Sequence, residues 1–133
     1  PLISPRQEPD SRLDELAHLT IGAAIEVHSQ LGPGYLESIY EEAMAVELGL
    51  RGLKYQRQVP LALEYKGRRI GEHRLDLLVE GRLILELKAV QEIAPIHRAQ
   101  VISYLKAMGM NLALLINFNV QRLQSGVDRI VLS

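Results

Sequence analysis

Apolar residues recur at helical spacing through the first third of the chain. Between residues 11 and 31 they fall three or four positions apart, which predicts a long amphipathic helix opened by a capping box of Ser11 and Asp14. Gly32-Pro33-Gly34 ends this helix, because proline cannot continue the hydrogen-bond ladder. A second helix is predicted over about 35–49, with a core-facing side made of Leu36, Ile39, Tyr40, Ala43 and Leu50.

The pattern then changes to the alternation that is typical of strands. Val59 to Tyr65 and Arg69 to Val79 are predicted to form a hairpin with its turn at Lys66-Gly67 and an irregularity at Gly71. The remaining elements are a strand over 83–90, a helix from Pro95 to Met108, a buried strand over 112–117 and a short strand over 127–132.

The predicted order is therefore α-α-β-β-β-α-β-β, an α/β fold with one mixed sheet flanked by helices. Residues 1–10 contain three prolines among polar side chains and are expected to form a flexible N-terminal tail. Residues 11–133 are expected to form a single domain, because no interior segment has the composition of a linker.

Composition narrows the function classes. The chain has no cysteine, which excludes a disulfide framework, a thiol nucleophile and a cysteine zinc site, and no apolar run is long enough to span a membrane. With no visible leader, a cytoplasmic location is expected. The net charge is only −1, but residues 51–74 carry seven basic and two acidic side chains, a segment that either meets phosphates or forms a solvated hairpin surface.

Candidate chemistry lies in the second and third strands. Glu86 and Lys88 share one face of an otherwise apolar strand, because side chains alternate along it. A three-residue turn at 80–82 would pair Asp76 with Glu86, whereas a two-residue turn would pair Asp76 with Leu85 and turn its side chain to the opposite face. Two adjacent carboxylates need a compensating cation, and their oxygens suit Mg²⁺ or Mn²⁺. The alternative is a cross-strand cluster of salt bridges.

A divalent metal at this point would polarise a phosphodiester and activate water, with Lys88 stabilising the developing charge or orienting the water. Arg74 either binds a phosphate or neutralises the acids, and Arg98 either approaches phosphate near a helix start or lies on the surface. Gln100 and Tyr104 share a helix face, from which they hold Lys88 or a phosphate or simply flank a core helix.

Five short segments occur in a characteristic order: Gly34-Tyr-Leu-Glu37-Ser-Ile-Tyr40, Arg74-Leu-Asp76, Glu86-Leu-Lys88, His97-Arg98-Ala-Gln100 and Tyr104-Leu105. Together they resemble the GxxExxY family, a branch of the PD-(D/E)XK nuclease-like superfamily, over about residues 13–132. The resemblance implies a restriction-endonuclease-like core in which Asp76 and Glu86 bind a divalent metal and Lys88 is the catalytic lysine. It also implies that Gln100 and Tyr104 lie beside the active site, as on a similar helix of RecB-like nucleases.

Glu37 lies in the first turn of the second predicted helix, where the helix dipole favours a carboxylate, and it is a candidate third metal ligand, either direct or through water. The leading hypothesis is a Mg²⁺- or Mn²⁺-dependent nuclease that acts on DNA in preference to RNA. The alternatives are a catalytically silent module that binds nucleic acid or protein, and a structural oligomerisation domain. Because the chain is small and nearly neutral, a homodimer or a partner protein would supply further binding surface, and no membrane association is expected.

Overall fold

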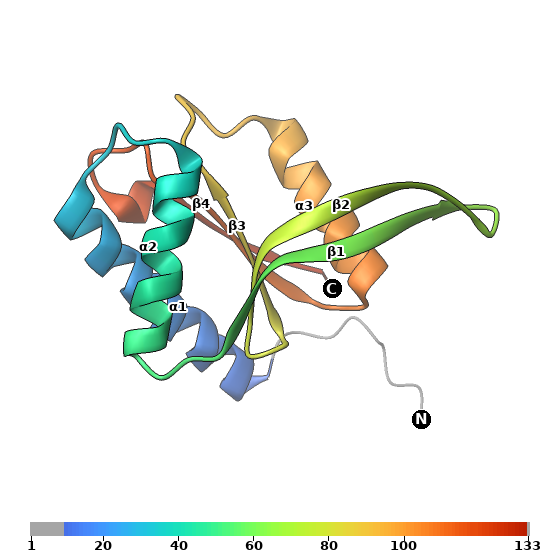
Figure 1. The fold of residues 1–133 in the computed structure, drawn as a ribbon, viewed down its shortest axis with the longest axis horizontal. Coiled ribbons are helices and arrows are strands. Elements are labelled where there is room, and N and C mark those ends of the chain that lie inside the picture. Colours follow the sequence, from blue (N-terminus) through green and yellow to red (C-terminus); the bar gives the residue numbers. More distant parts are fainter. Residues whose placement is uncertain (1–9, 133) are drawn as a thin grey trace.

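The computed structural model describes residues 10–132, which form an α/β fold with one mixed sheet, as predicted (Figure 1). In chain order the elements are α1 (Ser11–Leu31), α2 (Glu37–Leu50), β1 (Tyr55–Tyr65), β2 (Arg68–Val79), β3 (Leu83–Lys88), α3 (Pro95–Met108), β4 (Leu112–Asn117), the 3-10 turn η1 (Leu123–Gly126) and β5 (Val127–Val131). Within these residues, no helix is both long and apolar enough to cross a membrane.

The five strands lie in the order β1-β2-β3-β4-β5, and only β3 and β4 run parallel. Parallel neighbours need a crossover connection, which α3 provides. The strand β4 is buried along its whole length, and β3 is buried from Leu83 to Leu87. This explains why both strands are almost continuously apolar.

Helices cover both faces of the sheet. The face under α1 and α2 is an apolar cluster that includes Leu16, Met44 and Leu85. On the opposite face, Val101 and Leu105 of α3 pack with Ile84 in a second cluster. Side chains of β3 therefore alternate between two cores, and any polar residue on this strand is held rigidly.

The predicted core-facing side of α2 is wrong. Of its five residues only Tyr40 is buried, whereas Leu36, Ile39 and Leu50 are 76%, 43% and 77% exposed. The helix instead packs through Tyr40, Met44, Ala45 and Leu48. The α2 sequence is apolar on two sides, so hydrophobic spacing alone cannot tell which side meets the sheet.

The start of α1 also differs from the prediction. The N-cap is Asp10, whose Oδ1 accepts a hydrogen bond from the Leu13 backbone N–H at 2.8 Å, and not Ser11 with Asp14. Asp10 also forms a 2.8 Å ion pair with Arg82 in the β2–β3 turn. Asp10 thus belongs to the folded part, while the rest of the expected tail, residues 1–9, lies outside the described residues.

The outer half of the β1–β2 hairpin projects beyond the helices, and residues 62–72 are called the arm below (Figure 1). Its turn is Lys66-Gly67, where both residues have positive φ, the geometry that matches the twist of the flanking strands. The register changes from Leu63–Gly71 to Glu64–Arg69, which leaves Ile70 without a partner and confirms the predicted irregularity as a β-bulge.

Candidate active site

The two carboxylates at the centre of the site face each other across β2 and β3. The pairs Val79–Leu83 and Leu77–Leu85 show that the turn has three residues, Glu80 to Arg82. Continuing this register places Asp76 opposite Glu86, the first of the two predicted arrangements. Regular pairing of β2 with β3 stops at Leu77–Leu85, so the two strands separate at the position of the carboxylates.

Side chains replace the backbone ladder at this separation. The Asp76 backbone N–H donates to Glu86 Oε2 at 2.8 Å, and the Leu87 backbone N–H donates to Asp76 Oδ2 at 2.8 Å. Each carboxylate therefore satisfies a backbone donor that a regular ladder would have paired with a carbonyl. The reciprocal bonds orient both carboxyl groups and keep one further oxygen on each available to a ligand.

Burial makes the full negative charge of this pair unfavourable. Glu86 is only 5% exposed, and desolvation, together with the nearby Asp76, raises its pKa to about 8. Desolvation also raises the pKa of Asp76 to about 6, with a smaller contribution from the charge of Glu37. Two full negative charges on the pair are therefore unfavourable near neutral pH, and a bound cation would relieve this cost.

Lys88 lies two residues beyond Glu86, half-buried at the end of β3. Its charge lowers the pKa values of Asp76 and Glu86, although the larger effect of burial keeps both raised. Among residues 10–132 its ammonium group has no carboxylate within 4 Å. The Lys88 ammonium group lies near the carboxylate pair but forms no ion pair with it, so it remains able to bind an anionic group of a substrate.

His73 of β2 lies at the site, although the alternation of side chains along the strand did not predict it. Its Nε2 lies 3.5 Å from Glu86 Oε1, its Nδ1 lies 3.2 Å from the Tyr104 hydroxyl, and its ring stacks on Tyr104 at 4.0 Å between centroids. Burial lowers the pKa of His73, with a smaller contribution from Lys88. His73 contacts Tyr104 of α3, and its buried Nε2 points at Glu86 without a hydrogen-bond partner among residues 10–132. One of the two predicted helix residues thus lies next to the site.

Arg74 does not neutralise the two carboxylates as one prediction had it. Its guanidinium donates to the Gln58 carbonyl at 3.2 Å and lies 3.5 Å from Glu72. The physical reason is a break in alternation at Asp76: Leu75 packs in the α3 cluster and Leu77 in the α1/α2 cluster. His73 faces the acids in its place.

The other predicted residues of α3 lie farther out. Arg98 is exposed and forms an ion pair with Asp128 of β5, the surface placement that sequence left open. Gln100 is exposed, and its side chain makes no hydrogen bond with another residue in the range 10–132. Of the predicted α3 residues, Tyr104 is the one that the structure joins to the carboxylate pair, through His73.

Glu37 is positioned by the loop between α1 and α2. Gly34 has a φ of 110°, which favours glycine, and the fully buried Tyr40 donates from its hydroxyl to the Gly32 carbonyl at 2.6 Å. The same hydroxyl accepts from the Tyr35 backbone N–H at 3.2 Å, and the ring stacks on Phe118. The glycine and tyrosine of the Gly34–Tyr40 segment thus hold the loop, and Glu37 is the first residue of α2.

The charge of Glu37 raises the pKa values of both Asp76 and Glu86, so it lies within electrostatic range of them. Within residues 10–132, however, no three His, Asp or Glu side chains are gathered closely enough to hold one metal ion. The residues still fit Mg²⁺ or Mn²⁺, because such ions are commonly held by one or two carboxylates and complete their shell with water and substrate phosphate. The buried, like-charged pair is the observation that favours a cation here.

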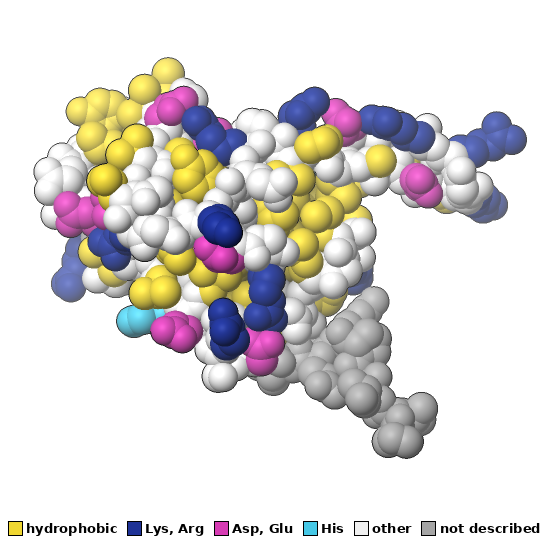
Figure 2. Space-filling model, turned by 60° about the horizontal axis from the view of Figure 1, so that its bottom comes forward, with side chains coloured by type: hydrophobic (Ala, Val, Ile, Leu, Met, Phe, Trp, Pro, Cys, Tyr) yellow, Lys and Arg dark blue, Asp and Glu magenta, His cyan; other side chains and the backbone are white. Residues whose placement is uncertain are grey.

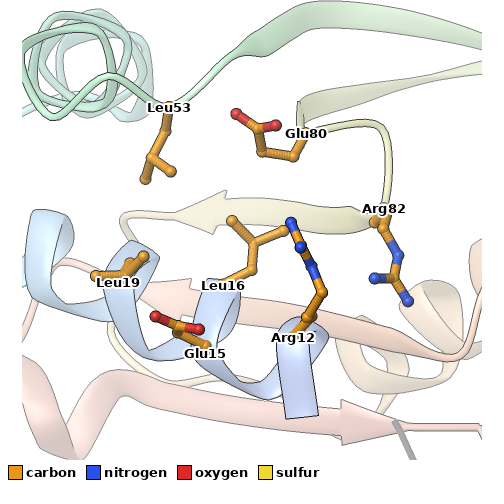
Figure 3. A pocket seen from close by; sticks show the side chains of 7 residues that line it. All are labelled: Arg12, Glu15, Leu16, Leu19, Leu53, Glu80 and Arg82. Carbon is orange, nitrogen blue, oxygen red and sulfur yellow. The ribbon is translucent and has the colours of Figure 1, made fainter. Parts of the chain in front are cut away.

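A separate hollow lies at the other end of the sheet, between α1, the segment before β1 and the β2–β3 turn (Figure 3). It is lined by Arg12, Glu15, Leu16, Leu19, Leu53, Glu80 and Arg82. Glu80 accepts from the Lys54 backbone N–H, and Arg82 pairs with Asp10. The hollow is lined by two basic and two acidic side chains, and it contains no buried carboxylate pair, so the Asp76–Glu86 pair remains the candidate for chemistry.

Comparison with known families gives one match. The family described as the PD-(D/E)XK nuclease superfamily matches residues 14–130, nearly the whole chain. No curated protein matches the chain. The five-stranded mixed sheet with helices on both faces is consistent with the restriction-endonuclease-like fold.

Proposed function

Because the chain belongs to the PD-(D/E)XK nuclease superfamily, we propose that it is a metal-dependent nuclease that hydrolyses phosphodiester bonds of DNA. The observation that carries the proposal is the buried Asp76–Glu86 pair, with both pKa values raised and with Lys88 beside it, which has no ion-pair partner in the part of the chain that the structure describes. The Gly34–Tyr40 segment further supports assignment to the GxxExxY branch, since its glycine and tyrosine hold the loop that presents Glu37.

In this proposal Asp76 and Glu86 hold Mg²⁺ or Mn²⁺, with the Leu87 carbonyl and Glu37, acting through water, as further ligands. The ion would supply Lewis-acid polarisation of the scissile phosphate and a more acidic water molecule. Lys88 stabilises the negative charge that develops on the phosphate or orients the attacking water. Tyr104 orients the His73 ring beside Glu86, while Arg74, Arg98 and Gln100 contact flanking phosphates.

The direct test is cleavage of labelled DNA duplexes, DNA single strands and RNA with Mg²⁺ or Mn²⁺. DNA cleavage that a chelator stops is expected, and Asp76→Asn should reduce it by about 100-fold or more, because it removes a charged ligand but keeps an oxygen for the Leu87 N–H. Asp14→Asn, an exposed change on α1, is the matched control and should cleave as the wild type does.

Failure to cut any of these substrates, or equal cleavage by Asp76→Asn and the wild type, would contradict the proposal. Tight DNA binding without cleavage would instead identify a catalytically silent binding module.

A further inference from the structure

The arm contributes little to the folded core. None of its residues, 62 to 72, is buried, and two apolar side chains near its end, Tyr65 and Ile70, are 60% and 69% exposed. An isolated two-stranded hairpin is only marginally stable in water. A projecting ribbon with this exposure is better explained by a contact outside the chain than by packing within it.

The end of the arm is basic. Lys66, Arg68 and Arg69 lie between residues 65 and 70, a stretch with no acidic residue. Arg69 pairs with Glu72, and the Lys66 ammonium lies over the Tyr65 ring, but neither Lys66 nor Arg68 has a carboxylate within 4 Å among residues 10–132. Figure 2 shows the dark blue side chains gathered at the far end of the arm, beyond the body of the protein.

One strand, β2, connects the end of the arm to Asp76 of the carboxylate pair. Arg68 at the end of the arm and Asp76 are eight residues apart on β2, and eight residues of strand span about 25 Å. That span corresponds to roughly 7 base pairs of a duplex. A single duplex could therefore meet the carboxylates and the end of the arm together.

We infer that the arm lies in the major groove of duplex DNA, with Lys66 and Arg68 against phosphates on either side; this inference rests on the proposed function. The major groove of B-DNA, about 12 Å wide, admits a two-stranded β-ribbon. The major groove of A-form RNA is too narrow for one, and a single strand has no groove. The arm therefore selects duplex DNA as the substrate class.

The test is equilibrium binding to labelled duplexes with Ca²⁺ in place of Mg²⁺ to prevent cleavage. For a duplex of about 20 base pairs, Lys66→Ala with Arg68→Ala should weaken binding about 10-fold and lower the slope of log K against log salt by about 2. Arg12→Ala with Arg122→Ala removes two exposed charges away from the arm and should leave the slope unchanged. A hairpin-capped duplex of about 6 base pairs should bind the arm variant and the wild type equally, because it cannot reach both regions.

Equal salt slopes for the arm variant and the wild type on the long duplex would overturn the arm assignment while leaving the nuclease proposal intact. Equal binding of duplex RNA and duplex DNA would overturn it as well. Absence of any nucleic-acid binding by the wild type would overturn both proposals.

A second, independent feature is the exposed side of α2. Its apolar residues are spaced alternately three and four apart, the spacing of a coiled-coil seam. Val46 is 62% exposed, in addition to the exposed leucines and isoleucine noted above, and Ala43 is half-buried. The seam, called the α2 stripe, consists of Leu36, Ile39, Ala43, Val46 and Leu50.

The α2 stripe reads nearly the same in both directions: leucine, β-branched, alanine, β-branched, leucine. A twofold interface requires a self-complementary patch, and an antiparallel copy would place Leu36 against Leu50 and Ile39 against Val46, with Ala43 at the crossing. The acids beside the stripe already have ion-pair partners, because Glu42 pairs with Arg57, which also pairs with Glu41, and Glu47 pairs with Arg51. The geometry points to a homodimer formed by antiparallel α2 helices.

A helix of this length gives a small interface, so a dimer that dissociates at about micromolar concentration is expected in sedimentation experiments. Val46→Glu should leave a monomer, whereas Ile96→Glu, which changes a residue of matched 61% exposure on α3, should not alter association. A monomeric wild type across the concentration range, or equal effects of the two variants, would overturn the dimer.

Orientation can be read by cross-linking, since the chain has no cysteine of its own. A mixture of Leu36→Cys and Leu50→Cys chains should form disulfide-linked dimers, while Leu36→Cys alone should not. Cross-linking of Leu36→Cys alone would identify a parallel arrangement and overturn the antiparallel one.

Discussion

A Glu86→Gln variant is expected to be more stable than the wild-type protein at neutral pH and to lose its affinity for divalent metal. Glu86 is 5% exposed, and burial raises its pKa from 4.5 to about 8. At neutral pH the folded state therefore retains a proton that the unfolded state, with a pKa of 4.5, has already released. Glutamine removes this ionisation, while its amide oxygen can still accept from the Asp76 N–H.

The sign of the effect depends on pH. Because the folded-state pKa is raised, the free energy of unfolding of the wild type falls as pH rises from 4.5 towards 8. At pH 7 the wild-type free energy of unfolding is lower than at acid pH by about 3 kcal/mol, and the variant should not show this decrease. The difference in free energy of unfolding between the variant and the wild type should vanish below about pH 4 and become constant above about pH 8.

Urea unfolding at several pH values, and metal binding followed by calorimetry, would measure the two effects. Glu92→Gln, an exposed change of the same kind, should alter neither quantity. If Glu86→Gln is less stable than the wild type at pH 7, Glu86 is a structural member of an ion-pair cluster and not a strained metal ligand.

The order of the elements could be predicted because hydrophobic periodicity is strong here. The continuous apolar runs around Ile84 and Leu115 correspond to the two central strands, buried from both faces. The sequence left the register at Asp76 open between a two-residue and a three-residue turn. Glu80 and Gly81 both adopt positive φ, which makes the three-residue turn and sets Asp76 opposite Glu86.

Other features depended on contacts that no local pattern records. Alternation placed Arg74 beside the carboxylates, but the alternation of β2 breaks at Asp76, so His73 turns towards Glu86 instead. A histidine that stacks on Tyr104, 31 residues away in sequence, leaves no signal in its own segment. The α2 stripe is a similar case, because its spacing is the same for a core face and for an exposed seam.

Lys88→Met is expected to reduce the rate of DNA cleavage by about 100- to 1,000-fold, the usual cost of removing one group that stabilises a developing negative charge. The fold should tolerate the change, because Lys88 is half-buried and none of residues 10–132 places a carboxylate within 4 Å of its ammonium group. Methionine keeps most of the length of the side chain without the charge.

Metal affinity separates this variant from Glu86→Gln. Lys88 is a positive neighbour of both carboxylates, so its removal takes away a charge that repels a bound cation, and divalent metal should bind as tightly as before or more tightly. Lys106→Met, a change on the exposed side of α3, should leave both cleavage and metal binding unchanged. A Lys88→Met protein that cleaves DNA within a few-fold of the wild-type rate would show that the lysine takes no part in the chemistry. One that loses metal together with activity would assign Lys88 to the architecture of the site, because a group acting only on the substrate phosphate has no reason to hold the ion.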